Sequence, residues 1–84
     1  MDRPDWWTWE LAYTEHAEQR MEERGISDVE LRAMLDASTC VEPASRVGRW
    51  AVRTRHGNRP GAVVLEPDAD ERLLFLVTMY PIRR

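Results

Sequence analysis

The sequence predicts a small α+β domain in which an N-terminal strand and two helices precede three to four antiparallel strands. Apolar residues alternate with polar ones before residue 14, and two helix-capping signals fall between residues 14 and 37. After Cys40 the helical periodicity disappears and short strand-like segments follow. This order is typical of helices covering one face of a sheet.

The N-terminal segment is rich in tryptophan. Residues 1–5 are expected to form a loose leader, and the alternation from Trp7 to Tyr13 predicts the first strand. Tryptophans at positions 6, 7 and 9 exceed what so small a core buries easily. We expect Trp9 in the core and some of the remaining indole surface against a partner protein or in a homodimer, because aromatic side chains are favoured interface anchors.

The first helix is predicted from its two ends. Thr14 can cap its N-terminus, and the helix is expected to run to about Arg24. Gly25 is the residue type that usually follows the last turn.

A capping box predicts the second helix. Ser27 is its cap and Glu30 reaches back to it, so the helix should run to about Ala37. One side is expected to be buried through the apolar residues Val29, Leu31, Ala33 and Met34.

Four strand segments are expected after the helices: Cys40–Glu42, Arg49–Arg55, Ala62–Glu66 and Arg72–Tyr80. Turns are expected at 56–58 and 67–70. The last segment is apolar on both faces, so it should lie in the interior of the sheet and end at Pro81.

Length and composition indicate a single domain over residues 1–84. No apolar run approaches the ~20 residues of a membrane span, so we expect a cytoplasmic protein without membrane contact. The lone cysteine, Cys40, agrees with a reducing compartment and is interpreted as buried filler. One cysteine and two histidines fall short of a structural zinc site, and no metal or cofactor is expected.

Charge is distributed unevenly along the chain. Residues 1–42 hold 4 arginines against 11 acidic residues, whereas residues 43–84 hold 8 arginines against 4. No acidic residue occurs from Pro43 to Leu65, the stretch that contains Arg46, Arg49, Arg53, Arg55, His56 and Arg59. Such a stretch fits either a polyanion-binding surface or a solvated sheet edge.

A polar stripe marks the first helix. His16, Arg20 and Arg24 recur every four residues and therefore lie on one side of it. A histidine beside two fixed cations suits general acid–base work on a phosphate ester, with the arginines holding the phosphate. The alternative is a structural stripe in which neighbouring glutamates pair with the arginines.

The strands offer a second set of candidate residues. Arg53 and Arg55 alternate with apolar positions and therefore share one face of their strand. Thr78 and Tyr80 share a face at the end of the last strand. A cationic, hydroxyl-bearing sheet face suits RNA, through phosphate contacts and base stacking, although a solvated face has the same pattern.

The string HAEQRMEERGISDVELRAML resembles a bacterial family whose members carry a His-Ala-x-x-Arg-Met-x-x-Arg-Gly-Ile-Ser pattern. Their small sheet ends in a Val-Thr-x-Tyr-like strand, which here reads LFLVTMYPIRR. The family is grouped with RelE-like and barnase-like folds, many of them endoribonuclease toxins of toxin–antitoxin systems. The resemblance covers about residues 11–82 and implies a RelE-like β-α-α-β-β-β fold.

The resemblance also implies a function. It points to a metal-independent endoribonuclease in which the ribose 2′-hydroxyl attacks the adjacent phosphate, with RNA as substrate and a cognate antitoxin protein as partner. The residues expected to carry this chemistry are His16, Arg20, Arg24 and Tyr80, with Arg53, Arg55 and Thr78 on the RNA. Two alternatives stay open on the same fold: a protein-interaction module and an RNA-binding module without cleavage.

Overall fold

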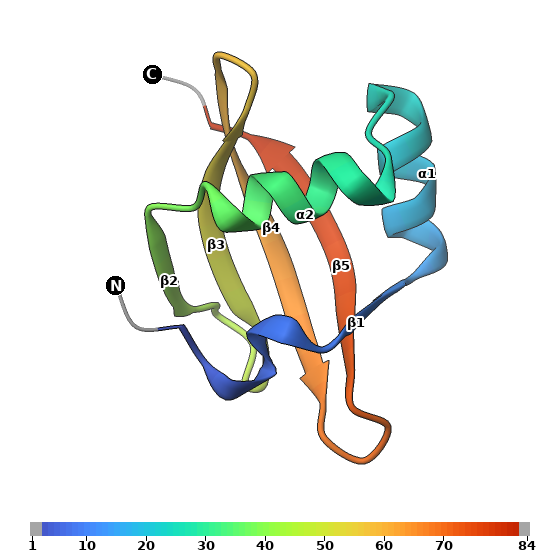
Figure 1. Ribbon diagram of the computed structural model, residues 1–84, viewed down its shortest axis with the longest axis vertical. Helices are drawn as coiled ribbons and strands as arrows, with labels where there is room; N and C mark the ends of the chain where they lie inside the picture. The colour runs from blue at the N-terminus through green and yellow to red at the C-terminus, as the bar shows by residue number, and fades with distance from the viewer. Residues whose placement is uncertain (1–2, 83–84) are drawn as a thin grey trace.

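The computed structural model describes residues 3–82 and contains a five-stranded sheet with two α-helices (Figure 1). A 3-10 turn, Asp5–Thr8, comes first. The main elements are β1 (Glu10–Tyr13), α1 (Glu15–Arg24), α2 (Asp28–Asp36), β2 (Cys40–Pro43), β3 (Trp50–His56), β4 (Arg59–Asp68) and β5 (Leu73–Pro81). The predicted α+β class and order of elements are confirmed. No helix within residues 3–82 has the length and apolar character of a membrane span.

The strands are ordered β1-β5-β4-β3-β2 in the sheet. β1 pairs with β5 in parallel, and every other pair is antiparallel. β5 is an interior strand, as predicted, while β4 occupies the middle. The β3–β4 turn needs only Gly57 and Asn58, because His56 already pairs with Arg59. β4 therefore begins three positions before the predicted Ala62.

Both helices lie against the sheet and supply five of the fourteen buried apolar residues within residues 3–82. α2 crosses over β3 and β4, and α1 runs beside β5 (Figure 1). The largest fully buried side chains come from α2 and the three inner strands: Leu31, Leu35, Val52, Val63, Leu65, Leu74 and Leu76.

The helix ends follow the predicted capping residues. The Thr14 hydroxyl accepts a hydrogen bond from the Ala17 N–H at 3.1 Å, and Gly25 adopts the left-handed conformation at φ 64°. Both bonds of the Ser27–Glu30 capping box are formed. These caps satisfy backbone groups that a helix end leaves without partners.

The N-terminal strand is shorter than predicted. Only Glu10–Tyr13 is extended, because the Trp7 N–H bonds to the Pro4 carbonyl at 3.0 Å and turns the chain into the 3-10 segment. This turn directs Trp7 into the core, where it is 5% exposed, and leaves Trp9 half-buried. Trp9 packs against the core as expected but is only partly buried, and Trp7 is the tryptophan that the core encloses.

The segment before this turn is anchored, where a loose leader was predicted. The Arg3 guanidinium donates to the carbonyl of Asp36 at 3.0 Å and lies 4.4 Å from the Trp7 ring centroid. A cation is favoured at a helix C-terminus, because the last carbonyls there lack partners within the helix. The remaining leader residues, 1–2, lie outside the described residues.

The buried side of α2 is rotated from the predicted one. Val29 is 79% exposed and Ala33 is also exposed, whereas Leu31, Met34 and Leu35 are buried. These three residues are spaced i, i+3 and i+4 and form one helical stripe. Leu35 completes that stripe, and Val29 falls outside it.

Candidate functional site

The N-terminus of α1 lies against the unpaired part of β5. β1 ends at Tyr13, opposite Leu76, so the rest of β5 has no strand partner on that side. The Thr14 hydroxyl donates to the Val77 carbonyl at 3.0 Å and ties the start of the helix to this edge. Two residues later, Nε2 of His16 lies 3.1 Å from the hydroxyl oxygen of Thr78.

A β-bulge sets the direction of the side chains that follow. Leu65 pairs with Leu76 and Val64 pairs with Thr78, so Val77 is an extra residue in β5. Met79 consequently returns to the core, while Thr78 and Tyr80 face away from it. Bulges commonly re-aim side chains in this way.

Thr78 and Tyr80 line a shallow hollow on the sheet face that the helices leave uncovered. We call it the open-face hollow; its volume is about 380 Å³ and it is completed by Ala44, Ser45, Arg46, Arg49, Ala51 and Val64. Arg49 is held by Glu66 at 2.9 Å. The hollow therefore combines three hydroxyl groups, those of Ser45, Thr78 and Tyr80, with two guanidinium groups next to an exposed imidazole.

A second hollow lies at the end of the sheet where β3 turns into β4. This hairpin-end cavity measures about 300 Å³ and is lined by residues of both helices, the hairpin and the end of β5. Its polar side chains are Glu23, Arg24, His56, Arg59 and Tyr80. Tyr80 is 47% exposed and lines both hollows, so the two are neighbours.

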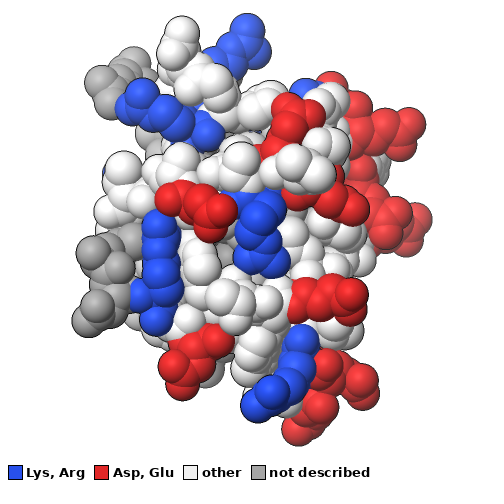
Figure 2. Space-filling model, in the orientation of Figure 1, with Lys and Arg blue, Asp and Glu red and all other residues white. Residues whose placement is uncertain are grey.

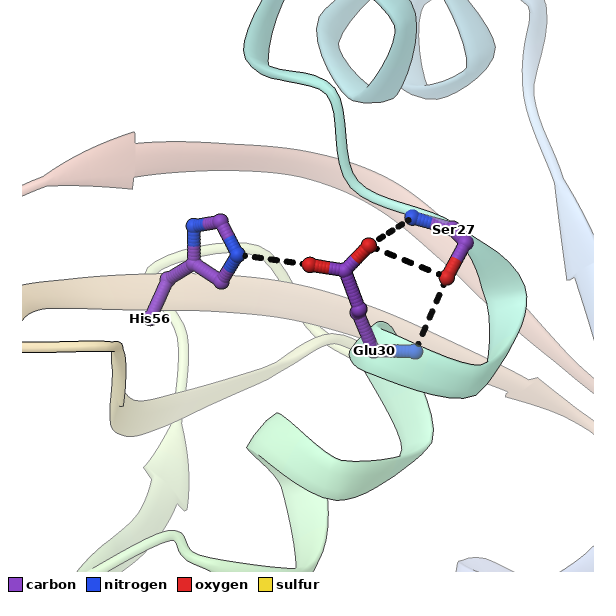
Figure 3. Close-up of polar contacts among 3 residues, drawn as sticks. All are labelled: Ser27, Glu30 and His56. Atoms are coloured by element: carbon purple, nitrogen blue, oxygen red, sulfur yellow. Dashed lines mark hydrogen bonds and ion pairs between the residues drawn. The ribbon is translucent and has the colours of Figure 1, made fainter.

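His56 is held in place by the capping box of α2 (Figure 3). Its Nε2 lies 3.0 Å from one Glu30 carboxylate oxygen, and the other oxygen accepts bonds from the Ser27 N–H and hydroxyl. These contacts, the one with His56 foremost, lower the pKa of Glu30 below its ordinary value. An ionised Glu30 thus fixes the imidazole at the wall of the hairpin-end cavity.

The sequence was compared with known proteins and structures. The model of a family described as a domain of unknown function (DUF4258) matches residues 13–81. This chain belongs to the DUF4258 family. None of the curated proteins compared with it matches.

Among solved structures, this DUF4258 domain is similar to the crystal structure of the Brucella abortus ribonuclease toxin, BrnT. The two chains are 18% identical, the match covers 92% of this chain and 100% of that one, and the TM-score is 0.67. The likeness confirms the predicted toxin-like fold, while the motif family suggested by the HAEQRMEERGIS string stays a prediction. The family match includes every residue of both hollows.

The stripe predicted on α1 spans the two hollows of the DUF4258 domain. His16 meets Thr78 beside the open-face hollow, and Arg24 lines the hairpin-end cavity. Between them, Nη1 of Arg20 lies 3.5 Å from Glu23, and its Nε is buried without a hydrogen-bond partner among the described residues. The predicted glutamate pairing thus holds for Arg20.

The two arginines predicted on β3 lie outside both hollows. Arg53 is exposed on the same sheet face as Tyr80, in the cross-strand row Arg53–Ala62–Tyr80, and lies 3.8 Å from Glu42. At a strand spacing of about 4.8 Å, its backbone is about 10 Å from that of Tyr80. Arg55 is exposed near the hairpin, beside Asn58 and Pro60.

Four basic residues of the hollows were not among the site residues predicted from the sequence: Arg46, Arg49, His56 and Arg59. The signal that contains them is the acid-free stretch, because all four fall between Pro43 and Leu65. Within residues 3–82, no three His, Cys, Asp or Glu side chains are placed to hold a metal ion together.

Figure 2 shows where charged side chains gather on one face of the molecule. Acidic side chains gather over α1 and basic ones stand at the end formed by the β3–β4 hairpin, while the rest of this face carries both signs. The exposed acids of α1 are Glu15, Glu18, Glu22 and Glu23. A polyanion is therefore attracted to the hairpin end and repelled by the outer side of α1.

Proposed function

We propose that this domain is a toxin-type endoribonuclease of a toxin–antitoxin system that cleaves RNA without a metal ion. The observation that supports this most directly is the 3.1 Å contact between His16 and Thr78. It brings the polar stripe of the helix to the hydroxyl-bearing end of the sheet, beside an arginine-lined hollow. General acid–base chemistry on a phosphate ester needs an imidazole and cations in that relation.

In the proposed reaction, His16 takes the proton of a ribose 2′-hydroxyl. The 2′-oxygen then bonds to the adjacent phosphorus, and the bond from phosphorus to the 5′-oxygen breaks. Tyr80 donates a proton to the departing 5′-oxygen, so the products are a 2′,3′-cyclic phosphate and a 5′-hydroxyl. Thr78 holds the imidazole ring toward the substrate, and a later proton exchange with water restores both side chains.

The arginines of the stripe are the proposed phosphate ligands. Arg24 lines a cavity with Tyr80, and Arg20 lies one turn before it on the same stripe, so we assign to both the offsetting of charge that develops on the phosphate oxygens. Arg53 and Arg55 lie farther out on the exposed sheet face and would contact flanking phosphates. Guanidinium groups suit this role because they bind phosphate in a bidentate manner.

The proposed partners are RNA and an antitoxin protein. The similar structure is that of a ribonuclease toxin, which supports the same class for this chain. The exposed arginines supply the surface that a polyanion requires.

Cleavage of single-stranded RNA by the purified domain tests the proposal. We expect His16→Ala to lower the rate by about 10²- to 10⁴-fold, the usual contribution of a general acid or base. Gln19→Ala, an exposed change on the same helix, is the control and should cleave normally. Equal rates for wild type and His16→Ala would remove His16 from the mechanism.

An alternative outcome separates the RNA-binding module. Wild-type protein that binds RNA with an affinity falling steeply with salt, yet leaves it uncut, would contradict the proposed nuclease and support binding alone.

The aromatic N-terminus favours a second candidate, a protein-interaction surface. Trp6 is half-buried, and its ring centroid lies 5.8 Å from those of Trp7 and Trp50. Such a surface would serve an antitoxin or a second copy of the chain. Sedimentation of wild type and Trp6→Ser, alone and with the antitoxin, tests this candidate. If Trp6→Ser has the same mass as wild type both alone and with the antitoxin, Trp6 is not part of such a surface.

A further inference from the structure

Arginines differ in whether a carboxylate neutralises them. Arg20, Arg49 and Arg53 each have a carboxylate oxygen within 4.0 Å. Across residues 3–82, no carboxylate lies that close to Arg24 or Arg59, and these two line the same cavity. Their charge is available to an external anion.

The hairpin-end cavity also has an apolar side. Ile26, Met34 and Met79 contribute side chains that are almost completely buried, and Pro60 adds its ring. A volume of about 300 Å³ is at the lower end of the range of small-molecule sites. A cavity with an apolar floor and a cationic rim fits a ligand that joins a flat apolar group to an anion.

The neighbouring groups strengthen this match. The one acidic side chain among the residues lining the cavity, Glu23, lies 3.5 Å from Arg20, which offsets its repulsion of an anion. His56 is fixed by Glu30 and presents a positioned, flat imidazole ring. Tyr80 connects the cavity to the open-face hollow, so a chain that lies in one hollow can continue into the other.

We propose that the hairpin-end cavity is a nucleotide-binding subsite for single-stranded RNA. One phosphate lies between Arg24 and Arg59, and the attached base lies on the floor formed by Ile26, Met34 and Met79. The subsite rests on the proposed function for its substrate class, and it adds a residue, Arg59, that binds the same phosphate as Arg24.

Binding, measured separately from cleavage, tests the subsite. The probe is a single-stranded oligoribonucleotide with 2′-O-methyl groups, which prevent attack by the 2′-hydroxyl, and affinity is followed by fluorescence anisotropy. A series of such probes replaces one phosphate at a time with an uncharged methylphosphonate. A second series removes one base at a time.

Arg59→Gln is expected to weaken binding of the unmodified probe by about tenfold, as for the loss of one charge-assisted contact. The difference in affinity between wild type and Arg59→Gln should vanish for the one probe whose methylphosphonate lies at the subsite. Removal of the base next to that linkage should weaken binding by the wild-type protein. Arg72→Gln makes the same charge change in the β4–β5 turn. It should change affinity about twofold at most, because salt screens distant charges.

Other results would overturn the subsite. These are an Arg59→Gln loss that is equal for every probe, an equal loss in Arg72→Gln, or no loss at all. Cleavage of the unmodified RNA is measured on the same preparations. Suppose first that cleavage depends on His16 but the effect of Arg59→Gln does not depend on the neutralised phosphate: this result would overturn the subsite alone. If the effect of Arg59→Gln does depend on one phosphate but no RNA is cleaved, the subsite is supported and the nuclease is overturned.

Discussion

His16 and Thr78 are 62 positions apart in the chain, and their side chains meet at 3.1 Å. The contact forms because Thr14 ties the first turn of α1 to the Val77 carbonyl, at the point where β1 ends and β5 becomes free along one side. One short segment therefore positions the imidazole against the sheet. The proposed proton transfer depends on this placement.

Removal of the Thr78 hydroxyl should weaken cleavage more than folding. We expect Thr78→Val to lower the cleavage rate by about tenfold, because the lost bond orients His16 and a net hydrogen bond contributes about 1 kcal/mol. The free energy of unfolding, measured in urea, should change by about 1 kcal/mol or less, since the imidazole partner is exposed to water. Thr39→Val makes the same change at an exposed position and should cleave at the normal rate. Matching rates for the two variants would contradict the orienting role.

The rotated face of α2 is testable with a matched pair of aliphatic side chains. Leu31→Ala should lower the free energy of unfolding by about 2–5 kcal/mol, because Leu31 is fully buried. Val29→Ala should change it by about 0.5 kcal/mol or less, because Val29 is 79% exposed. Denaturant unfolding of both variants measures these two changes and shows which side of α2 is buried. A larger loss for Val29→Ala would mean that Val29 is buried, as the sequence predicted, and would contradict the observed face.

Gly25 ends α1 in a conformation that other residues adopt at a cost. A Cβ at this position would meet no atom within 4 Å, so the effect of Gly25→Ala is conformational and not steric. We expect a loss of about 1–2 kcal/mol in the free energy of unfolding. Gly25→Asn should lose less, because asparagine tolerates the left-handed region. Equal stability of wild type and Gly25→Ala would contradict the observed φ of 64°.

Tyr13 should ionise at a higher pH than an ordinary tyrosine. Burial, followed by the neighbouring Asp28 carboxylate, raises the pKa of Tyr13 from 10.0 to about 12. The folded protein thus holds this proton more tightly than the unfolded chain, so the stabilisation is complete below pH 10 and is lost as the pH rises through about 12. Between pH 10 and about 12, the free energy of unfolding should fall more steeply with pH for wild type than for Tyr13→Phe.

The absorbance of tyrosinate gives an independent check. Tyr80→Phe leaves Tyr13 as the remaining tyrosine, and its titration should be centred near the raised value. A midpoint at the ordinary pKa in that variant would contradict the environment described for Tyr13.

Elements that depend on near neighbours in the chain were predictable from the sequence. Thr14, Gly25 and the Ser27–Glu30 box mark the helix ends because each satisfies backbone groups within a few residues. The alternation along β3 likewise buries Val52 and Thr54 and exposes Arg53 and Arg55, as predicted. His16, Arg20 and Arg24 form one stripe in the structure because residues four positions apart lie on the same side of a helix.

Only the tertiary structure decided which of these residues meet. The bulge at Val77 aims Thr78 and Tyr80 away from the core, and it arises from the register between β4 and β5, which no local pattern encodes. Arg59 reaches the same cavity as Arg24 because the β3–β4 hairpin and the end of α1 fall at one end of the sheet. Contacts between distant segments depend on how whole elements pack, so the stripe was readable in the sequence, whereas the contact of His16 with Thr78 and the cavity shared by Arg24 and Arg59 were not.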